Sequence, residues 1–498
     1  MNIRSVYPCF LLALVLIGNC ALAQAPSITY TPSTSVLTIN TAFSLSPVNA
    51  GGAVATLAYG PAASLGGASL ANPWGMGIDP SGNIYVTNYN AANQNASSIS
   101  KYNSAGVYQG TYGTTANLSQ PTGITFDASG NGYVLNYNRT NNGLGNDHGN
   151  GYVDQYNAAG VFQSTVVSGL GTANGIASDA SNNLYVAQGS YNNGANTASQ
   201  YNTSGAIAFS IATGHTTNPV AVAVDGSYNI YVLDNTNQTV TKYSSTGVYL
   251  STVVSGLSNP NAISVDGAGN IYIGDSGTHT VTVYSPAGAV ITTIAGLTDP
   301  RGLVTDSKGD LYISDYTNNT VTKSLPVGGY FISGPLPTGL SFSSLTGIIS
   351  GTPTVPFTAR NYTITAYNAS GSSSTTITLS CPPNLSIPAI SYNPPINVFT
   401  IGTLVSLSPV NTGGTPLSYS ISATLPAGLS FNTSTGVISG TPSAKATATI
   451  FTVTATDAAG SGTANVSIAC VVDNFWTGNS NKNGDWTDKK TGAPIAYL

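Results

Sequence analysis

The chain has 498 residues, of which 41% are hydrophobic, enough for about two to four domains with real cores. Only 6% of the residues are charged, and the formal net charge is −5. Such a chain has no basic patch to neutralise phosphates, which excludes nucleic-acid binding, and too little charge to steer a charged partner. The dense alternation of Val, Ile, Tyr and Thr argues against disorder and predicts packed β-sheet.

The first segment has the pattern of a secretory signal peptide. Arg4 precedes an apolar run at 10–17, and residues 21–23 (ALA) give the small-x-small sequence that signal peptidase requires. We expect cleavage after residue 23, with residues 1–23 as the signal peptide. Cys20 suggests acylation as an alternative, but Asn19 stands where a small residue is expected. No other run reaches the roughly 18 apolar residues of a transmembrane span, so we expect an exported protein, extracellular or at the cell surface.

Residues 53–325 contain six copies of one unit. The clearest copy, at 259–294, predicts four short strands separated by Gly, Asn, Asp or Pro turns. Each copy has a turn aspartate followed by a Gly/Asn turn and a Tyr-containing strand, and four-stranded units of this length are propeller blades. The turn aspartates are Asp79, Asp127, Asp179, Asp225, Asp266 and Asp306. With Asn-Pro or Asp-Pro opening four copies, the pattern resembles NHL repeats, which form six-bladed β-propellers.

A propeller must close its ring, and the sixth copy lacks a fourth strand because residues 320–325 run directly into Pro326. Upstream, residues 52–60 (GAVATLAYG) match residues 288–296 (GAVITTIAG), the fourth strand of the fifth copy. We therefore expect residues 53–59 to pair with residues 320–325. This pairing would remove two open sheet edges.

The sequence around the blades also repeats. Residues 27–52 match 389–414, and residues 330–381 match 419–470. These segments resemble the immunoglobulin-like, cadherin-like sandwich modules of bacterial surface proteins. We expect a first module formed by 26–52 together with 330–381, with the propeller inserted at a loop, and a second module at 387–470. The predicted fold class is all-β: a six-bladed β-propeller plus two Ig-like β-sandwich modules.

Two cysteines follow the predicted signal peptide. Cys381 and Cys470 hold the same position in successive modules. A disulfide requires Cα atoms within about 7 Å, and equivalent points of head-to-tail modules lie further apart, so we expect buried free thiols. Residues 471–498 fit a tail and the start of a further β module equally well.

The sequence offers little catalytic chemistry. One aspartate per turn cannot supply the roughly six to eight oxygens of a calcium site, so the turn aspartates are expected to cap hairpins. The histidines lack metal-ligand spacing, and no G-x-S-x-G elbow is present. No Glu or His recurs at the blade entrances, where lactonases and lyases that resemble this fold keep a central metal. We expect no catalytic and no metal-ligating residue. Calcium held by Asn side chains and backbone carbonyls is the one cofactor left open.

Candidate ligand-binding residues lie on one face of the predicted propeller. In the first three copies the loop after the second strand is extended, at 88–96, 136–150 and 188–196. These loops are rich in Asn, Gly and Tyr, which suits hydrogen bonding and stacking, although drift in unconstrained loops explains their length equally well. The loop candidates are Tyr89, Tyr137, Arg139, His148 and Tyr191.

The same face carries the residues five before each turn aspartate. Ring closure brings Trp74 beside Arg301, where stacking and a forked guanidinium could grip a glycan or peptide. Ordinary packing between blades is the alternative. The strand candidates are Trp74, Thr122, Asn174, Asn261 and Arg301.

These features predict an exported, non-enzymatic recognition or adhesion protein whose propeller face binds carbohydrate or protein. The alternative is a metal-dependent lyase or lactonase that uses the central channel, and a structural spacer of the envelope is a third reading. A propeller alone does not decide between them, because the fold hosts binding modules and enzymes alike.

Overall fold

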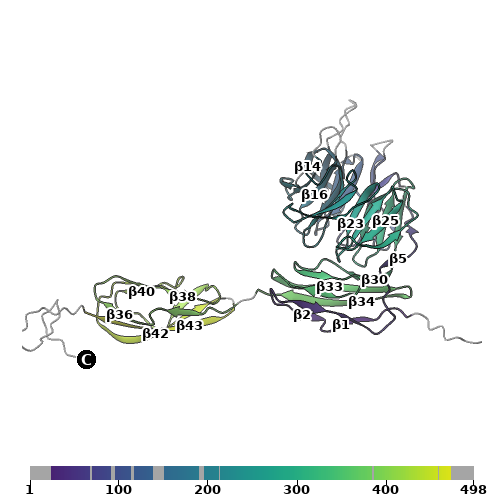
Figure 1. Ribbon diagram of the computed structural model, residues 1–498. Coiled ribbons are helices and arrows are strands. Elements are labelled where there is room, and N and C mark those ends of the chain that lie inside the picture. The colour runs from purple at the N-terminus through teal and green to yellow at the C-terminus, as the bar shows by residue number, and fades with distance from the viewer. Residues whose placement is uncertain are drawn as a thin grey trace, which may run out of the picture. The chain divides into compact units, whose positions relative to one another are not determined.

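The computed structural model describes residues 24–67, 70–90, 96–113, 117–137, 151–189, 196–211, 214–383, 386–457 and 459–472 (Figure 1). Every regular element within these ranges is a β-strand, so the predicted all-β fold is confirmed. The chain forms two compact units, Met1–Pro382 and Pro383–Leu498. None of the residues described forms a helix with the length and apolar character needed to cross a membrane.

Across the described ranges, six four-stranded antiparallel sheets follow one another along the first unit. Their innermost strands contact each other in cyclic order, and the last, β27 (Pro300–Thr305), packs against the first, β7. This closed ring is a β-propeller. The strands of the first five sheets are β7 (Pro73–Ile78), β8 (Ile84–Asn88), β9 (Ser98–Tyr102) and β10 (Tyr108–Thr111); β11 (Pro121–Phe126), β12 (Gly132–Asn136), β13 (Gly151–Tyr156) and β14 (Phe162–Leu170); β15 (Thr172–Ser178), β16 (Leu184–Gly189), β17 (Thr197–Tyr201) and β18 (Ile207–Ser210); β19 (Pro219–Val224), β20 (Ile230–Asp234), β21 (Thr239–Tyr243) and β22 (Tyr249–Val254); and β23 (Pro260–Val265), β24 (Ile271–Asp275), β25 (Thr280–Tyr284) and β26 (Val290–Ile294).

The sixth sheet is completed by an early strand, but not by the one expected. It contains β27, β28 (Leu311–Asp315), β29 (Thr320–Ser324) and β6 (Ala63–Ser64), with Ser64 opposite Thr322. The prediction that residues 53–59 close the ring is therefore wrong. Within that segment, β5 (Ala58–Tyr59) pairs with β30 (Pro326–Ile332), the strand that leaves the propeller. The apolar pattern that matched a blade strand instead buries Leu57 against Phe331 and covers the edge of β30.

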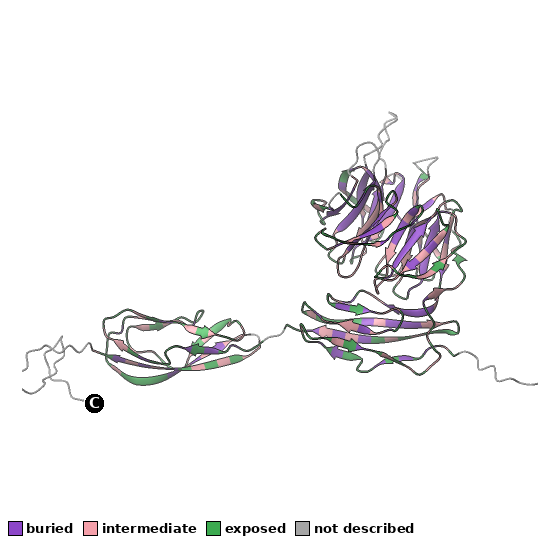
Figure 2. Cartoon of the chain, in the orientation of Figure 1, coloured by how far each residue is buried: buried purple, intermediate pink, exposed green. Residues whose placement is uncertain are grey.

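The rest of the first unit is a sandwich built from both sides of the propeller. Residues that precede the propeller, such as Ile28 and Leu45, share one buried core with Tyr330 and Ile364, which follow it. Buried residues line the inner faces of its sheets (Figure 2). Its sheets are β2 (Thr34–Val36), β34 (Gly371–Cys381), β33 (Phe357–Asn368), β30 and β5; β3 (Phe43–Leu45), β32 (Ile349–Gly351) and β31 (Leu340–Phe342); and β1 (Ile28–Tyr30) with β4 (Pro47–Asn49).

The second unit repeats this strand pairing without an insertion. Its sheets are β36 (Ile396–Thr400), β43 (Ser461–Val471), β42 (Ala446–Thr456) and β39 (Ser418–Ile421); β37 (Val405–Leu407), β41 (Ile438–Gly440) and β40 (Leu429–Phe431); and β35 (Ile390–Tyr392) with β38 (Pro409–Asn411). Even a single contact recurs: the Tyr30 hydroxyl donates to the Gly347 carbonyl, and the Tyr392 hydroxyl donates to that of Gly436. The internal sequence repeat therefore encodes the same core twice.

The two cysteines in the described residues are free thiols, as expected. Cys381 is 0% exposed and Cys470 is 2% exposed. Burial raises the pKa of the Cys470 thiol. Because iodoacetamide reacts with an accessible thiolate, we expect neither residue to be alkylated in the native protein and both to be alkylated in denaturant. Peptide mass spectrometry after the two treatments checks this. Fast native labelling of either cysteine would contradict the packing.

Candidate functional site

The turn aspartates stabilise the turns of the blades through hydrogen bonds to their carboxylate oxygens. In each of the first five sheets one oxygen accepts two main-chain N–H groups, and the other accepts an Asn amide and a Tyr hydroxyl. Asp225, for example, accepts from Ser227 N and Asn229 N (both 2.9 Å), from Asn229 Nδ2 (2.8 Å) and from the Tyr231 hydroxyl (3.1 Å). In the sixth sheet an aspartate, Asp310, replaces the Asn and pairs with Lys323 Nζ at 2.6 Å. The predicted capping role is confirmed, and it marks one end of every blade.

The candidate strand residues gather at the other end of the blades, around the central channel. Thr122, Asn174, Asn261 and Arg301 line one cavity of about 60 Å³ on the propeller axis. The cavity is small because the inner strands approach closely at glycines: a Cβ at Gly123 would lie 2.8 Å from Ile176 Cγ2. Apolar residues also line it: Met76, Ile124, Ile176, Val222, Ile263 and Leu303.

This volume limits what can bind. It holds a few water molecules, whereas small-molecule sites usually measure about 300 Å³ or more. A ligand at this end therefore lies across the mouth of the channel, over the residues that surround it.

One half of the mouth is an aromatic cluster. The Arg301 guanidinium carbon lies 4.1 Å from the ring centroid of Trp74 and 4.2 Å from that of Tyr316. Tyr89 packs on Trp74 with centroids 4.7 Å apart, and Tyr137 follows at 6.2 Å from Tyr89. The expected contact between Trp74 and Arg301 is thus confirmed. We call Trp74, Tyr89, Tyr137 and Tyr316 the aromatic arc; it covers the sixth, first and second sheets.

The guanidinium is held in place electrostatically as well. Arg301 Nε donates to Asp299 Oδ2 at 2.9 Å, and the main-chain N–H of Asp299 donates to Asp315 Oδ1 at 3.1 Å. This ion pair balances the arginine charge at the mouth. Burial, reinforced by the neighbouring Tyr137 and Tyr316 and opposed by Arg301, raises the pKa of Tyr89 to about 12. The Tyr89 phenol is therefore a neutral hydrogen-bonding group at physiological pH.

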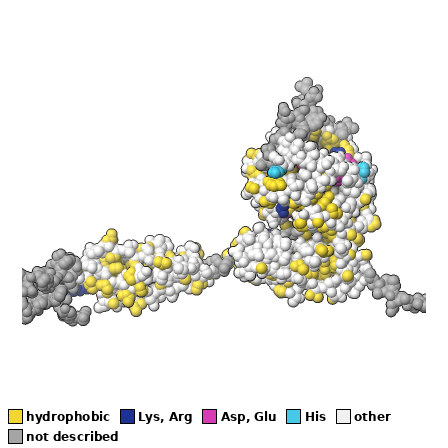
Figure 3. Space-filling model, viewed as in Figure 1, with side chains coloured by type: hydrophobic (Ala, Val, Ile, Leu, Met, Phe, Trp, Pro, Cys, Tyr) yellow, Lys and Arg dark blue, Asp and Glu magenta, His cyan; other side chains and the backbone are white. Residues whose placement is uncertain are grey.

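The other half of the mouth is built from side-chain amides. Asn235 Nδ2 donates to Asn259 Oδ1 at 2.7 Å, and both Asn259 Nδ2 and Asn261 Nδ2 donate to Ser276 Oγ, at 2.7 and 2.9 Å. These four residues, the amide arc, lie on the fourth and fifth sheets. On the face of the chain seen in Figure 3 few charged side chains appear, in keeping with the 6% of charged residues in the sequence.

The structure brings together seven of the ten candidates, and they differ in how far a ligand could reach their side chains. Thr122 is 1% exposed, and its hydroxyl donates to the Ala173 carbonyl at 3.2 Å, so it joins two sheets. Arg139, His148 and Tyr191 lie outside the described residues. No group of three or more His, Cys, Asp or Glu side chains in the described part of the chain is placed to hold a metal ion.

The sequence analysis did not predict Tyr316, Asn235, Ser276 and Asn259. The first three each follow directly after the second strand of their sheet, as Tyr89 and Tyr137 do, and Asn259 directly precedes β23. Tyr89 and Tyr137 drew attention because they open extended loops, whereas the later loops are short. Alignment of this one position across the copies finds five of the eight arc residues: Tyr89, Tyr137, Asn235, Ser276 and Tyr316.

One family model matches part of the C-terminal region of the chain. The family described as "Putative Ig domain" matches residues 300–381 and 387–471. No curated protein matches the chain. Similar solved structures include a gluconolactonase from Xanthomonas campestris (12% identity, covering 55% of this chain and 98% of that chain, TM-score 0.42) and an auxiliary nutrient binding protein from Bacteroides ovatus (13%, 61% and 98%, 0.42). A virginiamycin B lyase from Staphylococcus aureus is another (11%, 59% and 99%, 0.36). The family match shows that the C-terminal region of this chain contains Ig-like domains.

Proposed function

We propose that this chain is an exported, non-enzymatic recognition and adhesion protein, at the bacterial cell surface or in the medium, whose NHL-type propeller binds carbohydrate across its mouth. One observation carries the proposal: the aromatic arc and the amide arc face the same opening. A sugar ring has apolar C–H faces that stack on aromatic rings and a rim of hydroxyls. Asn side chains suit such a rim because each amide both donates and accepts.

The size of the channel supports surface recognition over chemistry within the channel. A lyase or lactonase would enclose its substrate, and the described cavity of about 60 Å³ is far below the usual size of such sites. An extended glycan needs no enclosure, since successive sugars can lie along the two arcs.

The domain organisation belongs to the same proposal. Residues 1–23 act as the signal peptide, and the propeller extends over 61–325. The first sandwich uses 26–59 and 326–381, and the second uses 387–470. The two sandwiches serve as stalk modules that carry the propeller.

Glycan-array binding of the full chain, followed by calorimetry with the best hit, tests the proposal. We expect Trp74→Ala and Asn261→Ala each to weaken binding by about tenfold or more, equivalent to about 1.4 kcal/mol. Trp74→Phe, which keeps an aromatic ring in the packing, should retain part of the affinity. Tyr249→Ala is the matched control, because Tyr249 is an exposed aromatic on β22, the outermost strand of the fourth sheet, stacked on His215 at 3.8 Å.

Two results would contradict the assignment. If glycan binding were indifferent to both Trp74→Ala and Asn261→Ala, the mouth would not be the site. If no glycan bound but a protein array gave ligands sensitive to the same substitutions, the site would stand and its ligand would be a protein.

A further inference from the structure

We propose a second binding site at the opposite end of the propeller, in the crevice between its turns and the first sandwich, for a small carboxylic acid of the size of a monosaccharide or a simple aromatic acid. The crevice has a volume of about 380 Å³, within the usual range of small-molecule sites. Both of its walls belong to the first compact unit. This site does not depend on the function proposed for the mouth.

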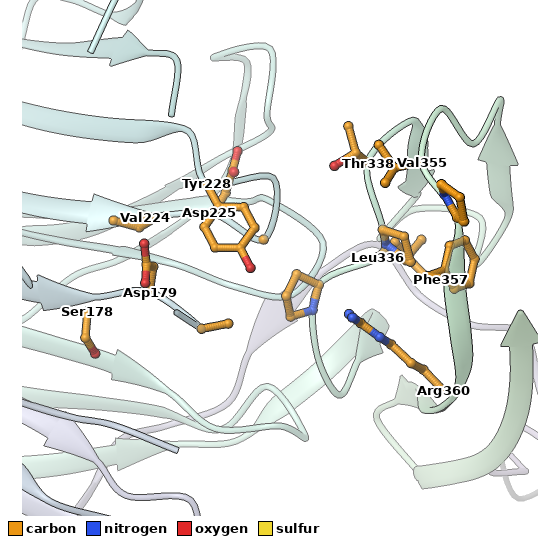
Figure 4. A pocket seen from close by; sticks show the side chains of 15 residues that line it. Ser178, Asp179, Val224, Asp225, Tyr228, Leu336, Thr338, Val355, Phe357 and Arg360 are labelled. Carbon is orange, nitrogen blue, oxygen red and sulfur yellow. The ribbon is translucent and has the colours of Figure 1, made fainter. Parts of the chain in front are cut away.

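The crevice is held open by tight contacts beside it. A Cβ at Gly226 would overlap the Pro335 ring, and a Cβ at Gly267 would lie 2.6 Å from the Ile332 carbonyl oxygen. The propeller and the sandwich thus meet closely at Gly226 of the fourth sheet and Gly267 of the fifth. Beside these contacts, the turns of the third and fourth sheets, with Asp179 and Asp225, form the propeller wall of the cavity (Figure 4).

A cationic side chain faces this space without a carboxylate of its own. Arg360, on β33, extends toward the propeller (Figure 4). Among the described residues, the ion pairs are Lys242 with Asp225, Arg301 with Asp299 and Lys323 with Asp310, and Arg360 takes part in none of them. The two aspartates of the propeller wall are already satisfied. Asp179, for example, accepts from Ser181 N, from both nitrogens of Asn183 and from the Tyr185 hydroxyl.

Tyr228 is the second reason to place a ligand here. Its φ is 62°, in the left-handed region, where the equivalent turn positions carry Gly82, Gly130, Gly269, Gly309 and, once, Asn182. A bulky residue at such a position costs of order 1 kcal/mol or more, and strain of this kind concentrates at binding sites. The ring reaches into the crevice from the wall opposite Arg360 (Figure 4).

Together these groups define the ligand class. A guanidinium presents paired donors that match the two oxygens of a carboxylate, and a phenol hydroxyl can add a further donor. The remaining wall is largely apolar, with Leu336, Phe357 and Val355, and suits the body of the acid.

Calorimetry and saturation-transfer NMR on the full chain, with two matched pairs of probes, test this site: phenylacetate against phenylacetamide, and galacturonate against galactose. We expect at least one acid to bind about tenfold or more tightly than its neutral partner, and Arg360→Gln to abolish that preference. Tyr228→Gly should weaken the acid at least severalfold without lowering the melting temperature, since glycine relieves the backbone strain. Lys445→Gln, which removes an exposed cation from the second unit, is the control and should change nothing.

Acid binding that survives both Arg360→Gln and Tyr228→Gly would overturn the proposal. So would the absence of binding by all four probes at millimolar concentration, or equal binding of each acid and its neutral partner.

Discussion

Replacement of Leu65 by proline is expected to destabilise the propeller by roughly 3 kcal/mol. The Leu65 main-chain N–H donates to the Val321 carbonyl at 2.8 Å, directly after the pairing of Ala63 and Ser64 with the last sheet. Proline removes this donor and leaves the carbonyl without its partner at the seam of the ring. The Leu65 side chain also packs on the cluster that contains Met76, so the substitution loses apolar contacts as well.

Thermal unfolding followed by circular dichroism measures the effect. At about 2 to 4 °C per kcal/mol for a domain of this size, the melting temperature should fall by roughly 6 to 12 °C. Leu65→Ala is the matched control because it keeps the N–H and loses only side-chain packing. If the two variants melted together, the hydrogen bond at the seam would contribute nothing and the closure by β6 would be in doubt.

The blades were predictable because each copy contains the residues that form its own turn. The turn aspartate, the Asn four residues later and the Tyr six residues later form one hydrogen-bonded unit within a single hairpin, as at Asp225, Asn229 and Tyr231. All the partners lie within a few residues of each other, so the sequence pattern and the structure coincide. The repeated sandwich core was predictable for a related reason, since two copies expose the same positions.

The closing strand was not predictable from pattern alone. Residues 53–59 and 63–65 both precede the first blade, and both are short segments without charged residues. Which of them meets β29 depends on where β30 leaves the propeller and on the burial of Leu57 against Phe331, contacts that join positions more than 250 residues apart. A strand of two residues is too short to show the alternation of apolar and polar residues by which a strand is recognised in a sequence.

The candidate site was predictable in part. Trp74 and Arg301 were expected to meet because the ring joins the first blade to the last, and they do. Asp299 and Tyr316, which fix the guanidinium, depend on side-chain directions that blade spacing does not specify.

The second large effect is expected for Phe331→Ala, at about 3 to 5 kcal/mol. Phe331 is 3% exposed and belongs to a buried cluster with Leu57 and Tyr272, although it lies on β30 of the sandwich sheet. Its ring fills the space against Gly309, and its centroid lies 6.4 Å from that of Tyr59. The Tyr59 hydroxyl in turn donates to the Gly309 carbonyl at 2.9 Å. Loss of the ring therefore removes packing from the propeller and the sandwich at once.

A second core phenylalanine separates coupling from simple loss of stability. Phe342 is 6% exposed and belongs to the sandwich core, outside the cluster that contains Phe331, so Phe342→Ala should cost a similar free energy and leave that cluster intact. In calorimetry we expect the first unit of the wild type and of Phe342→Ala to unfold in one transition, and that of Phe331→Ala to unfold in two. If both variants unfolded in a single transition, the buried cluster around Phe331 would not be needed for cooperative unfolding. The propeller and the sandwich would then be coupled by the chain segments that connect them, at β5 and β30.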